Sequence, residues 1–373
     1  MTGLRELRPF GHSSWAAPFH EFSTMRLSSA EAAPLTVAEL AAIAGRSVDD
    51  MLRDVPLGYE RSGGSTALRT AIAATLPGVD AESVVVTTGA GEALAALVAT
   101  LIHPGDHAVV GWPAADCLTV ALERAGCDAS PVGAPFDTDT ILALVTPATR
   151  AVFLGSPHNP TGTVIGATAL TSIAAALEPG GGVLVADEVF RGIAVGGAVQ
   201  PPAASLAPNA VTVGGLSKVC GLAGLRIGWA AGPPLLVDDV RGHHAAASRC
   251  PAAVCQALAL VALEHLDPLL RRTCDLVHDN LQHLAALIDR HPACSLDVPE
   301  GGSLAFPAIP VDDIDAWCTR LALEHGLLVA PGPACFGIPG RVRLNLAAER
   351  SYWRAAAPLL DAELATAVGG APW

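Results

Sequence analysis

The segment SKVCGLAGLRIG, residues 217–228, contains Lys218, and this is the single lysine of the chain. The 373 residues include 22 lysines and arginines in total, so the remaining 21 are arginines. An arginine keeps its proton at all ordinary pH values and cannot attack a carbonyl carbon, whereas a desolvated lysine can. Lys218 is therefore the position at which the sequence indicates amine chemistry.

Short apolar runs on both sides of this segment alternate with longer helical stretches. Runs that predict strands buried on both faces lie at residues 84–87, 108–110, 151–154, 183–186 and 211–213. Helices are expected over residues 92–102 and 115–125, and a long helical region over 234–289 with breaks near 249–251 and 267–268. Strands of this kind separated by helices indicate an α/β fold with a mostly parallel sheet.

The pattern of predicted helices and strands changes after Pro292. Short strands near residues 303–307, 327–329 and 342–346, with one helix near 314–325, predict a smaller α+β domain. The chain is therefore divided into an arm with part of the small domain (1–50), a large domain (51–245), and a linking helix with the small C-terminal domain (246–373). The first fifty residues look irregular, and their aromatic residues Phe10, Trp15, Phe19 and Phe22 are expected to pack on another surface, such as a partner subunit.

The amino-acid composition argues against several classes of binding partner and against a metal site. The net charge of −14 disfavours nucleic acid and anionic membrane surfaces. The nine cysteines and twelve histidines lack metal-ligand spacing, so no metal site is expected. The longest apolar run, residues 93–102, is much shorter than the roughly 20 residues of a membrane span. Because the first residues contain no apolar segment typical of a secretory signal, a cytoplasmic location is expected.

Further motifs follow the predicted strands. Asn159-Pro160-Thr161-Gly162 comes after the strand at 151–154, and Asp187 ends the strand at 183–186, at the sheet edge where α/β proteins bind ligands. The backbone N–H groups of Ala90 and Gly91 open a helix, which suits a phosphate. A dinucleotide site is excluded there, since Leu94 occupies the third glycine position.

From about Tyr59 to Arg343 the chain resembles the class I/II aminotransferases, which are fold-type I pyridoxal-5′-phosphate (PLP) enzymes. The most specific match is Ser217-Lys218-x5-Gly224-Leu225-Arg226-Ile227-Gly228. The resemblance implies a large domain with a mostly parallel seven-stranded sheet and a smaller α+β domain. It also implies that Lys218 forms a Schiff base with PLP, and that Ser217 and Arg226 bind the cofactor phosphate.

The same resemblance implies roles for the other motif residues. Asn159 would bond the 3′-oxygen of the cofactor, and Asp187 would pair with its pyridine nitrogen. Tyr59, in Tyr59-x4-Gly64, would reach the phosphate in the other subunit of a homodimer with shared active sites. Arg343 would bind the α-carboxylate of an amino-acid substrate beside Asn159, with Arg341 as the alternative.

Three positions depart from the family pattern. Phe190 stands where a tyrosine usually donates to the 3′-oxygen, and a phenyl ring cannot do this. Ala115 stands where an aromatic ring usually stacks on the pyridine, and Trp112 is a candidate replacement. Gly215 replaces a hydroxyl residue three positions before Lys218.

The resemblance leaves the reaction open. The segments 157–162, 216–228 and 300–306 resemble capreomycidine synthase-like enzymes of natural-product pathways, and a resemblance to histidinol-phosphate aminotransferases is about as close. Aminotransfer in amino-acid or specialised metabolism is favoured. Elimination with cyclisation, γ-replacement or decarboxylation are the alternatives. A PLP-binding regulator is disfavoured, because the short N-terminal segment shows no helix-turn-helix pattern.

Overall fold

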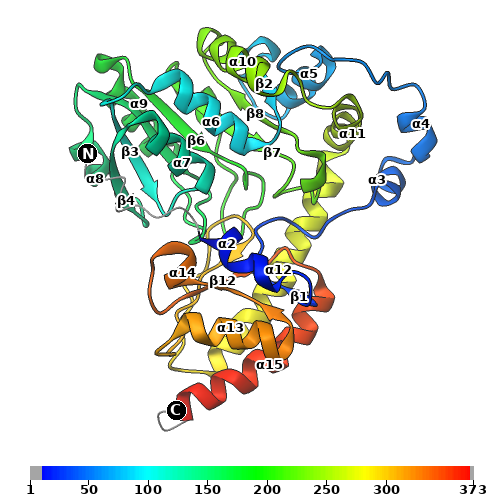
Figure 1. Cartoon of the computed structure of the whole chain (residues 1–373), viewed down its shortest axis with the longest axis vertical. Helices are drawn as coiled ribbons and strands as arrows, with labels where there is room; N and C mark the ends of the chain where they lie inside the picture. The colour runs from blue at the N-terminus through cyan, green and yellow to red at the C-terminus, as the bar shows by residue number, and fades with distance from the viewer. Residues whose placement is uncertain (1–10, 370–373) are drawn as a thin grey trace.

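A seven-stranded sheet lies at the centre of the upper part of the molecule in Figure 1, a computed structural model that describes residues 11–369. The strand order is β2-β8-β7-β6-β5-β3-β4. The strands from β4 to β7 pair in parallel, whereas β8 pairs antiparallel with both β2 and β7. The strands are β2 (Val84–Thr87), β3 (His107–Trp112), β4 (Asp128–Gly133), β5 (Thr149–Gly155), β6 (Val183–Asp187), β7 (Ala210–Gly215) and β8 (Gly228–Ala231). The prediction of a mostly parallel seven-stranded sheet is confirmed.

Two of these strands were not predicted from the sequence. β4 is an edge strand that contains Pro131, and proline is tolerated there because an edge strand has unpaired N–H groups. β8 contains only four residues around Trp229, too few to show a pattern, although all four are buried. Both strands depend on their neighbours in the sheet rather than on a strong local preference.

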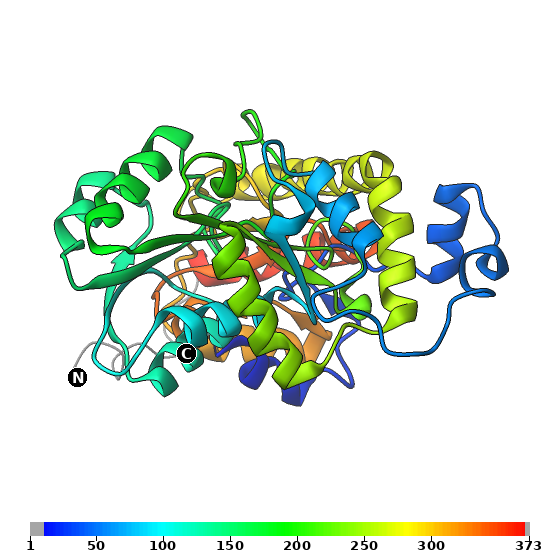
Figure 2. The same cartoon turned by 90° about the horizontal axis from the view of Figure 1, so that it is seen from above.

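Helices cover the two faces of this sheet, and Figure 2 shows the sheet between them. One face packs against α6 (Ala90–Leu101), α7 (Asp116–Ala125) and α10 (Pro234–Ser248). The other face packs against α8 (Thr138–Leu144) and α9 (Ala167–Leu177), and near β2 and β8 against α5 (Thr66–Ala74) and α11 (Ala253–Glu264). The interior strands are buried on both faces for this reason.

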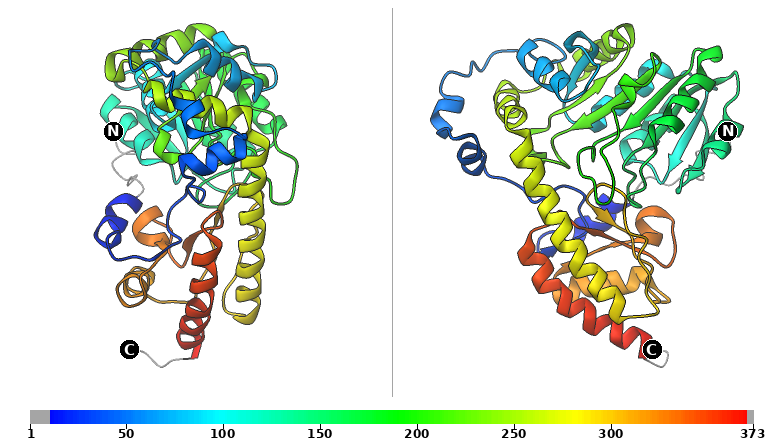
Figure 3. Two further views of the ribbon diagram at one scale, coloured as in Figure 1. Left: turned by 90° about the vertical axis from the view of Figure 1, so that its right-hand side faces the viewer. Right: turned by 180° about the vertical axis from the view of Figure 1, so that it is seen from behind.

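A smaller α+β part lies below the sheet in Figure 1. Its three-stranded sheet has the order β11-β12-β9, with antiparallel pairing throughout. The long helix α12 (Leu266–Arg290) runs from the upper part down along α15 (Arg350–Gly369), as Figure 3 shows. The other elements are β9 (Leu304–Ala305), α13 (Ile314–His325), β10 (Leu327–Leu328), β11 (Ala330–Pro331), α14 (Gly332–Phe336) and β12 (Val342–Asn345).

Some predicted boundaries need correction. The second break in the long helical region falls at His265, and Pro268 lies in the first turn of α12, where a proline removes no intrahelical hydrogen bond. The expected strand at 327–329 is shorter, β10 at Leu327–Leu328, and a separate strand, β11, begins at Ala330. The divisions of the chain after residues 50 and 245 stay predictions.

The N-terminal segment is more regular than expected. α3 (Val37–Ala44) and α4 (Val48–Leu52) each begin at a capping box, formed by Thr36 with Glu39 and by Ser47 with Asp50. Such pairs stabilise the first turn of a helix and are visible in the sequence. These two short helices lie at the right of Figure 1, away from the main body.

The aromatic residues of the arm pack within their own chain. Trp15 on α2 (His12–Ala16) contacts the core of the smaller part, and its ring lies 5.2 Å from that of Phe19. β1 (Met25–Arg26) pairs in parallel with β10, so the arm also joins the smaller part through the backbone. Phe22 is half exposed, and Phe10 lies outside the described residues.

Among the described residues, no single helix is both long and apolar enough to cross a membrane. The pair α11 and α12 meets the length and composition requirements only when both helices are taken together, and it is bent by 79°.

Candidate active site

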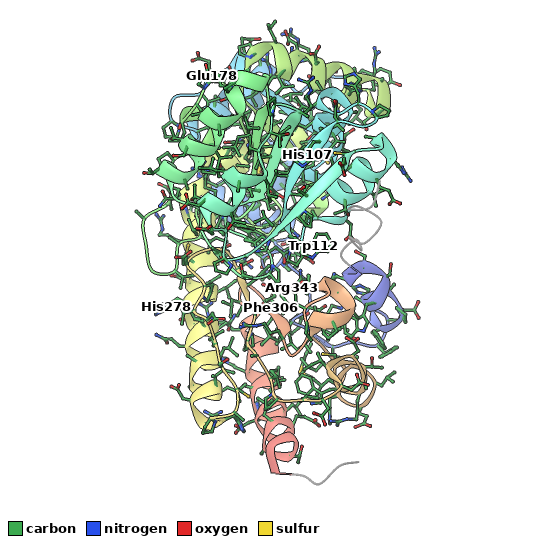
Figure 4. The ribbon with its side chains drawn as sticks, turned by 90° about the vertical axis from the view of Figure 1, so that its left-hand side faces the viewer. His107, Trp112, Glu178, His278, Phe306 and Arg343 are labelled. Atoms are coloured by element: carbon green, nitrogen blue, oxygen red, sulfur yellow. The ribbon has the colours of Figure 1, made fainter. Side chains whose placement is uncertain are left out.

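A cavity of about 770 Å³ lies where the carboxyl ends of the parallel strands face the smaller part. Asp187 ends β6, Asn159 follows β5, Lys218 follows β7, and Arg343 comes from β12 on the opposite side. Figure 4 shows Arg343 between the two parts of the molecule, below Trp112 and beside Phe306. The crevice outside the carboxyl ends of parallel strands is where open α/β sheets bind ligands.

Lys218 lies in the wall of this cavity, with 29% of its side chain exposed. The loop that carries it leaves β7 and returns to β8, and it is closed by a hydrogen bond from the Leu216 N–H to the Ile227 carbonyl (3.3 Å). Burial lowers the pKa of Lys218, while the Glu31 carboxylate, 3.9 Å from Nζ, opposes this shift. The amine is thus more readily neutral, and more nucleophilic, than that of an exposed lysine.

Asp187 presents a carboxyl group to the same cavity. Its Oδ1 accepts a hydrogen bond from the Val189 N–H (3.2 Å). Burial raises the pKa of Asp187 to about 6, although this hydrogen bond and nearby Lys218 act in the opposite direction. A buried carboxylate of this kind is stabilised by a cation bound in the cavity.

Arg226 and the N-terminus of α6 converge at one end of the cavity. Gly89, with φ of +89°, caps α6, and a Cβ atom placed on it would lie 2.3 Å from Nη2 of Arg226. A guanidinium beside the positive end of a helix is unfavourable unless an anion lies between them. This end of the cavity therefore suits a phosphate, with Ala90 in its wall.

Arg343 is buried, with 2% of its surface exposed. It donates through Nη1 to Oδ1 of Asn159 (3.0 Å) and through Nη2 to the carbonyl oxygen of Ser28. Its Nε has no hydrogen-bond partner among the described residues. Burial lowers the pKa of Arg343 to about 10, so it is charged at neutral pH. A guanidinium has five N–H donors, and these two hydrogen bonds leave donors for a further acceptor in the cavity that Arg343 lines.

Arg341 occupies a different environment. Its guanidinium donates to the Phe306 carbonyl (2.7 Å) and to Oδ2 of exposed Asp297 (2.9 Å), and it does not line the cavity. Arg343 lines the cavity and Arg341 does not, and the assignment of the substrate carboxylate to Arg343 stays a prediction.

The structure does not bring every predicted site residue to the cavity. Gly91 and Ser217 are chain neighbours of lining residues but do not line it themselves. Tyr59 is 84% exposed and lies under the guanidinium of Arg249, 5.3 Å from the ring centre. A contribution of Tyr59 to an active site thus requires a second copy of the chain.

Two of the residues that depart from the family pattern lie in the cavity wall. Phe190 is buried, lines the cavity, and packs against Ala30 and Leu304. Ala115 lines the cavity too, whereas Trp112 is half-buried and does not. In this structure Trp112 does not replace the missing ring.

Several lining residues were not predicted from the sequence. His158, next to Asn159, is buried between the Pro113 carbonyl (3.0 Å) and the Thr161 hydroxyl (2.9 Å). Burial lowers the pKa of His158 to about 4, so its imidazole is neutral. Ser28, Ser29 and Glu31 come from an irregular segment without a motif. Only the place of His158 beside Asn159 offered a signal in the sequence.

Known proteins resemble this chain over most of its length. The family model for aminotransferase class I and II matches residues 54–354. A capreomycidine synthase from Streptomyces vinaceus is 31% identical over 349 residues, which cover 90% of this chain and 87% of that protein. A probable N-succinyldiaminopimelate aminotransferase from Mycobacterium tuberculosis is 35% identical over 225 residues, covering 56% of this chain and 57% of that protein.

Solved structures agree with these relatives. A PLP-dependent aminotransferase from Streptococcus suis superimposes with a TM-score of 0.91 at 27% identity, covering 96% of this chain and 98% of that one. The PLP-dependent cyclase OrfR superimposes with a TM-score of 0.88 at 29% identity, covering 96% and 97%. The resemblance, fold class and cofactor inferred from the sequence are thereby confirmed. The chain belongs to the class I and II aminotransferase family, whose members are PLP-dependent enzymes.

Proposed function

We propose that this chain is a PLP-dependent enzyme that acts on an α-amino acid, that Lys218 holds the cofactor through its amine, and that the reaction is aminotransfer. One observation carries this proposal. The only side-chain amine of the sequence lies in a cavity that has a carboxyl group from Asp187 in one wall and, at one end, the Arg226 guanidinium beside the N-terminus of α6. When bound, the cofactor supplies an electron sink for the charge that develops at the substrate Cα.

The residues in the cavity fit each part of this cofactor. Arg226, the N-terminus of α6 at Ala90 and Gly91, and the neighbouring Ser217 hydroxyl would hold the phosphate. Asp187 would pair with the pyridine nitrogen, and the charge of that ring would offset the cost of burying the carboxylate. Asn159 would bond the 3′-oxygen, and the side chain of Phe190 would cover the ring from its buried position.

Arg343 and Lys218 would then act on the substrate. Arg343 has an unused Nε donor and a fixed orientation, so it would bind the α-carboxylate, with Asn159 beside it. The Lys218 amine, once it is free of the cofactor, would remove the Cα proton as a general base. Holding the carboxylate at a fixed point determines which bond at Cα faces the amine.

We extend this proposal to a homodimer with shared active sites. Leu57 and Tyr59 are 85% and 84% exposed, and they follow the two helices that lie apart from the main body in Figure 1. Exposed large apolar side chains on such a segment are typical of a protein–protein contact. Tyr59 would contribute to the phosphate site of the second copy. Activity in the cytoplasm, in amino-acid or specialised metabolism, belongs to the same proposal.

A half-reaction tests aminotransfer. The PLP-loaded protein is incubated with single amino acids, without a keto acid, and the cofactor is then analysed by chromatography and absorbance. Aminotransfer converts the cofactor stoichiometrically to pyridoxamine phosphate and releases one keto acid per site. Consumption of an amino acid while the cofactor stays in the PLP form would show that aminotransfer is wrong.

That second outcome matches another candidate reaction. Elimination with cyclisation is supported by the similarity to a capreomycidine synthase over 90% of this chain and to a PLP-dependent cyclase over 96% of it. Phe190 is compatible with such chemistry, since it places a phenyl ring without a hydroxyl group in the cavity. Mass spectrometry of the organic product separates a ring-closed amino acid from a keto acid. If no amino acid is changed, the protein is a PLP-binding protein without this activity.

A further inference from the structure

Residues 28–35, called the strap below, cross one wall of the active-site cavity as an irregular segment held by its backbone. The strap is tied to four different elements or loops of the molecule. Because hydrogen bonds fix it along its length, its side chains point in defined directions although it has no secondary structure. The hydrogen bonds are Arg343 Nη2 to Ser28 O, Asn345 Nδ2 to Glu31 O (2.8 Å), Ala33 N to Ala347 O (2.8 Å), Arg272 Nη1 to Ala33 O (2.9 Å) and Leu35 N to Gly221 O (3.0 Å).

The strap brings one acidic residue close to the reactive amine and one apolar residue to the wall of the same cavity. Ala30 packs against Phe190 and Leu304. The next residue, Glu31, lines the cavity, and its Oε2 lies 3.9 Å from Nζ of Lys218. No other ion pair of Lys218 is present among residues 11–369. Glu31 is therefore the acidic side chain that pairs with Lys218 among the described residues.

We propose that Glu31 is a positioning residue that controls the charge of Lys218. When the free Lys218 amine accepts a proton from the substrate Cα, the resulting ammonium gains an ion pair with the Glu31 carboxylate. In this step the Cα–H bond breaks, the proton forms a new bond to Nζ, and the electron pair stays at Cα, for which the cofactor would be the electron sink. The inference rests on the proposed function, because it concerns the same amine. It adds a residue outside the sheet to the proton-transfer machinery.

Other charged groups near Lys218 do not replace Glu31. Arg343 and Arg226 are cations that disfavour the ammonium form, whereas Asp187 favours it. In the proposed function Asp187 is paired with the cofactor. His12 also faces Lys218, but burial lowers the pKa of His12 to about 3, so it is neutral. Of the two carboxylates that act on Lys218, Glu31 is therefore the one that the cofactor would leave free to offset the two guanidinium groups.

The single lysine makes a direct test possible. Competitive acetylation of the full-length, cofactor-free protein, read out by mass spectrometry of the peptide that contains Lys218, gives the pH midpoint at which this amine becomes reactive. Glu31→Gln removes the carboxylate charge and is expected to move the midpoint down by about half a pH unit, since an opposite charge is lost and Glu31 is partly exposed. Glu349→Gln is the matched control: its side chain also lines the cavity, and the midpoint should stay at the wild-type value.

Further variants separate charge from shape. Glu31→Asp keeps the charge on a shorter side chain, and its midpoint should lie between those of the wild type and Glu31→Gln. Equal midpoints in the wild type, Glu31→Gln and Glu349→Gln would overturn the inference, and so would equal shifts in Glu31→Gln and Glu31→Asp. Borohydride reduction of the PLP-loaded variants is the independent readout. If none of the proteins, the wild type included, carries a pyridoxyl group on Lys218 after reduction, the proposed function is refuted, whatever the acetylation midpoints show.

Discussion

The wall of the cavity formed by the seven-stranded sheet and the wall formed by the strap hold their side chains by different means. In the sheet wall, Asp187 is the last residue of β6 and Lys218 follows the adjacent strand β7, and the register of the two strands pairs Asp187 with Val213. In the strap wall, Glu31 is held by side-chain donors such as Asn345 and by packing of Ala30 on Phe190. The sheet wall thus carries groups that the proposed chemistry requires, whereas the strap wall carries a group that adjusts them. Arg343 joins both walls, through Asn159 and Ser28.

The largest expected effect comes from the sheet wall. Lys218→Arg keeps a positive charge but removes the only amine that could hold the cofactor and the base that could take the Cα proton. We expect amino-acid turnover to fall by about 10³-fold or more. Single-turnover absorbance measurements check this value. Turnover within tenfold of the wild type would remove Lys218 from the proposed chemistry.

The next effect tests the residue that joins the two walls. Arg343→Gln should lower kcat/KM for amino acids by about 10²-fold, because a buried, charge-assisted contact to the carboxylate is lost. Arg341→Gln, two residues away, loses an exposed ion pair and should change kcat/KM by less than about twofold. Steady-state measurement of kcat/KM for both variants shows which of the two arginines binds the carboxylate. Equal losses would show that the carboxylate is bound elsewhere.

Asp187 gives a pH-dependent effect in the sheet wall. Burial raises its pKa from 3.8 to about 6, so the folded, cofactor-free protein is destabilised once this group ionises. The penalty is absent below about pH 4, where Asp187 is protonated in both folded and unfolded chains, and it is complete above about pH 6. The unfolding free energy of the wild type, relative to that of Asp187→Asn, should therefore fall by about 3 kcal/mol as the pH rises through this range. Urea unfolding at several pH values measures the difference, and a flat difference would show that Asp187 is not buried in this way.

The smallest effect concerns the phosphate end. Gly89→Ala and Gly105→Ala both place a side chain at φ of +89°, but only the Cβ at Gly89 meets another residue, namely Arg226. Both variants should lose about 1 kcal/mol of stability from backbone strain. Only Gly89→Ala should also weaken PLP binding, by about tenfold. A fluorescence titration with PLP checks this, and equal affinities of the two variants would argue against a phosphate between Arg226 and α6.

The side chains of the sheet wall could be predicted from the sequence, because the pattern of short apolar strands determines where they lie. Asp187, Asn159 and Lys218 each follow a short apolar strand, and parallel strands bring their carboxyl ends to one edge. The family motif around Lys218 then pointed to Arg226, which lines the cavity as Arg343 does, and the roles given to both arginines stay predictions.

The strap wall could not be predicted in this way. Residues 28–35 have no periodic pattern, and their positions depend on hydrogen bonds to residues about 190 to 315 positions away in sequence. No rule for local structure relates Glu31 to Lys218. The two capping boxes before α3 and α4, by contrast, were readable signals that the sequence analysis missed.

The most direct test of the central claim is borohydride reduction of the PLP-loaded wild-type protein, followed by peptide mass spectrometry. A pyridoxyl group on Lys218, at one per chain and absent from Lys218→Arg, is the predicted result. A protein that takes up no PLP, or one whose reduced cofactor is attached at the N-terminal amine instead, would contradict the account.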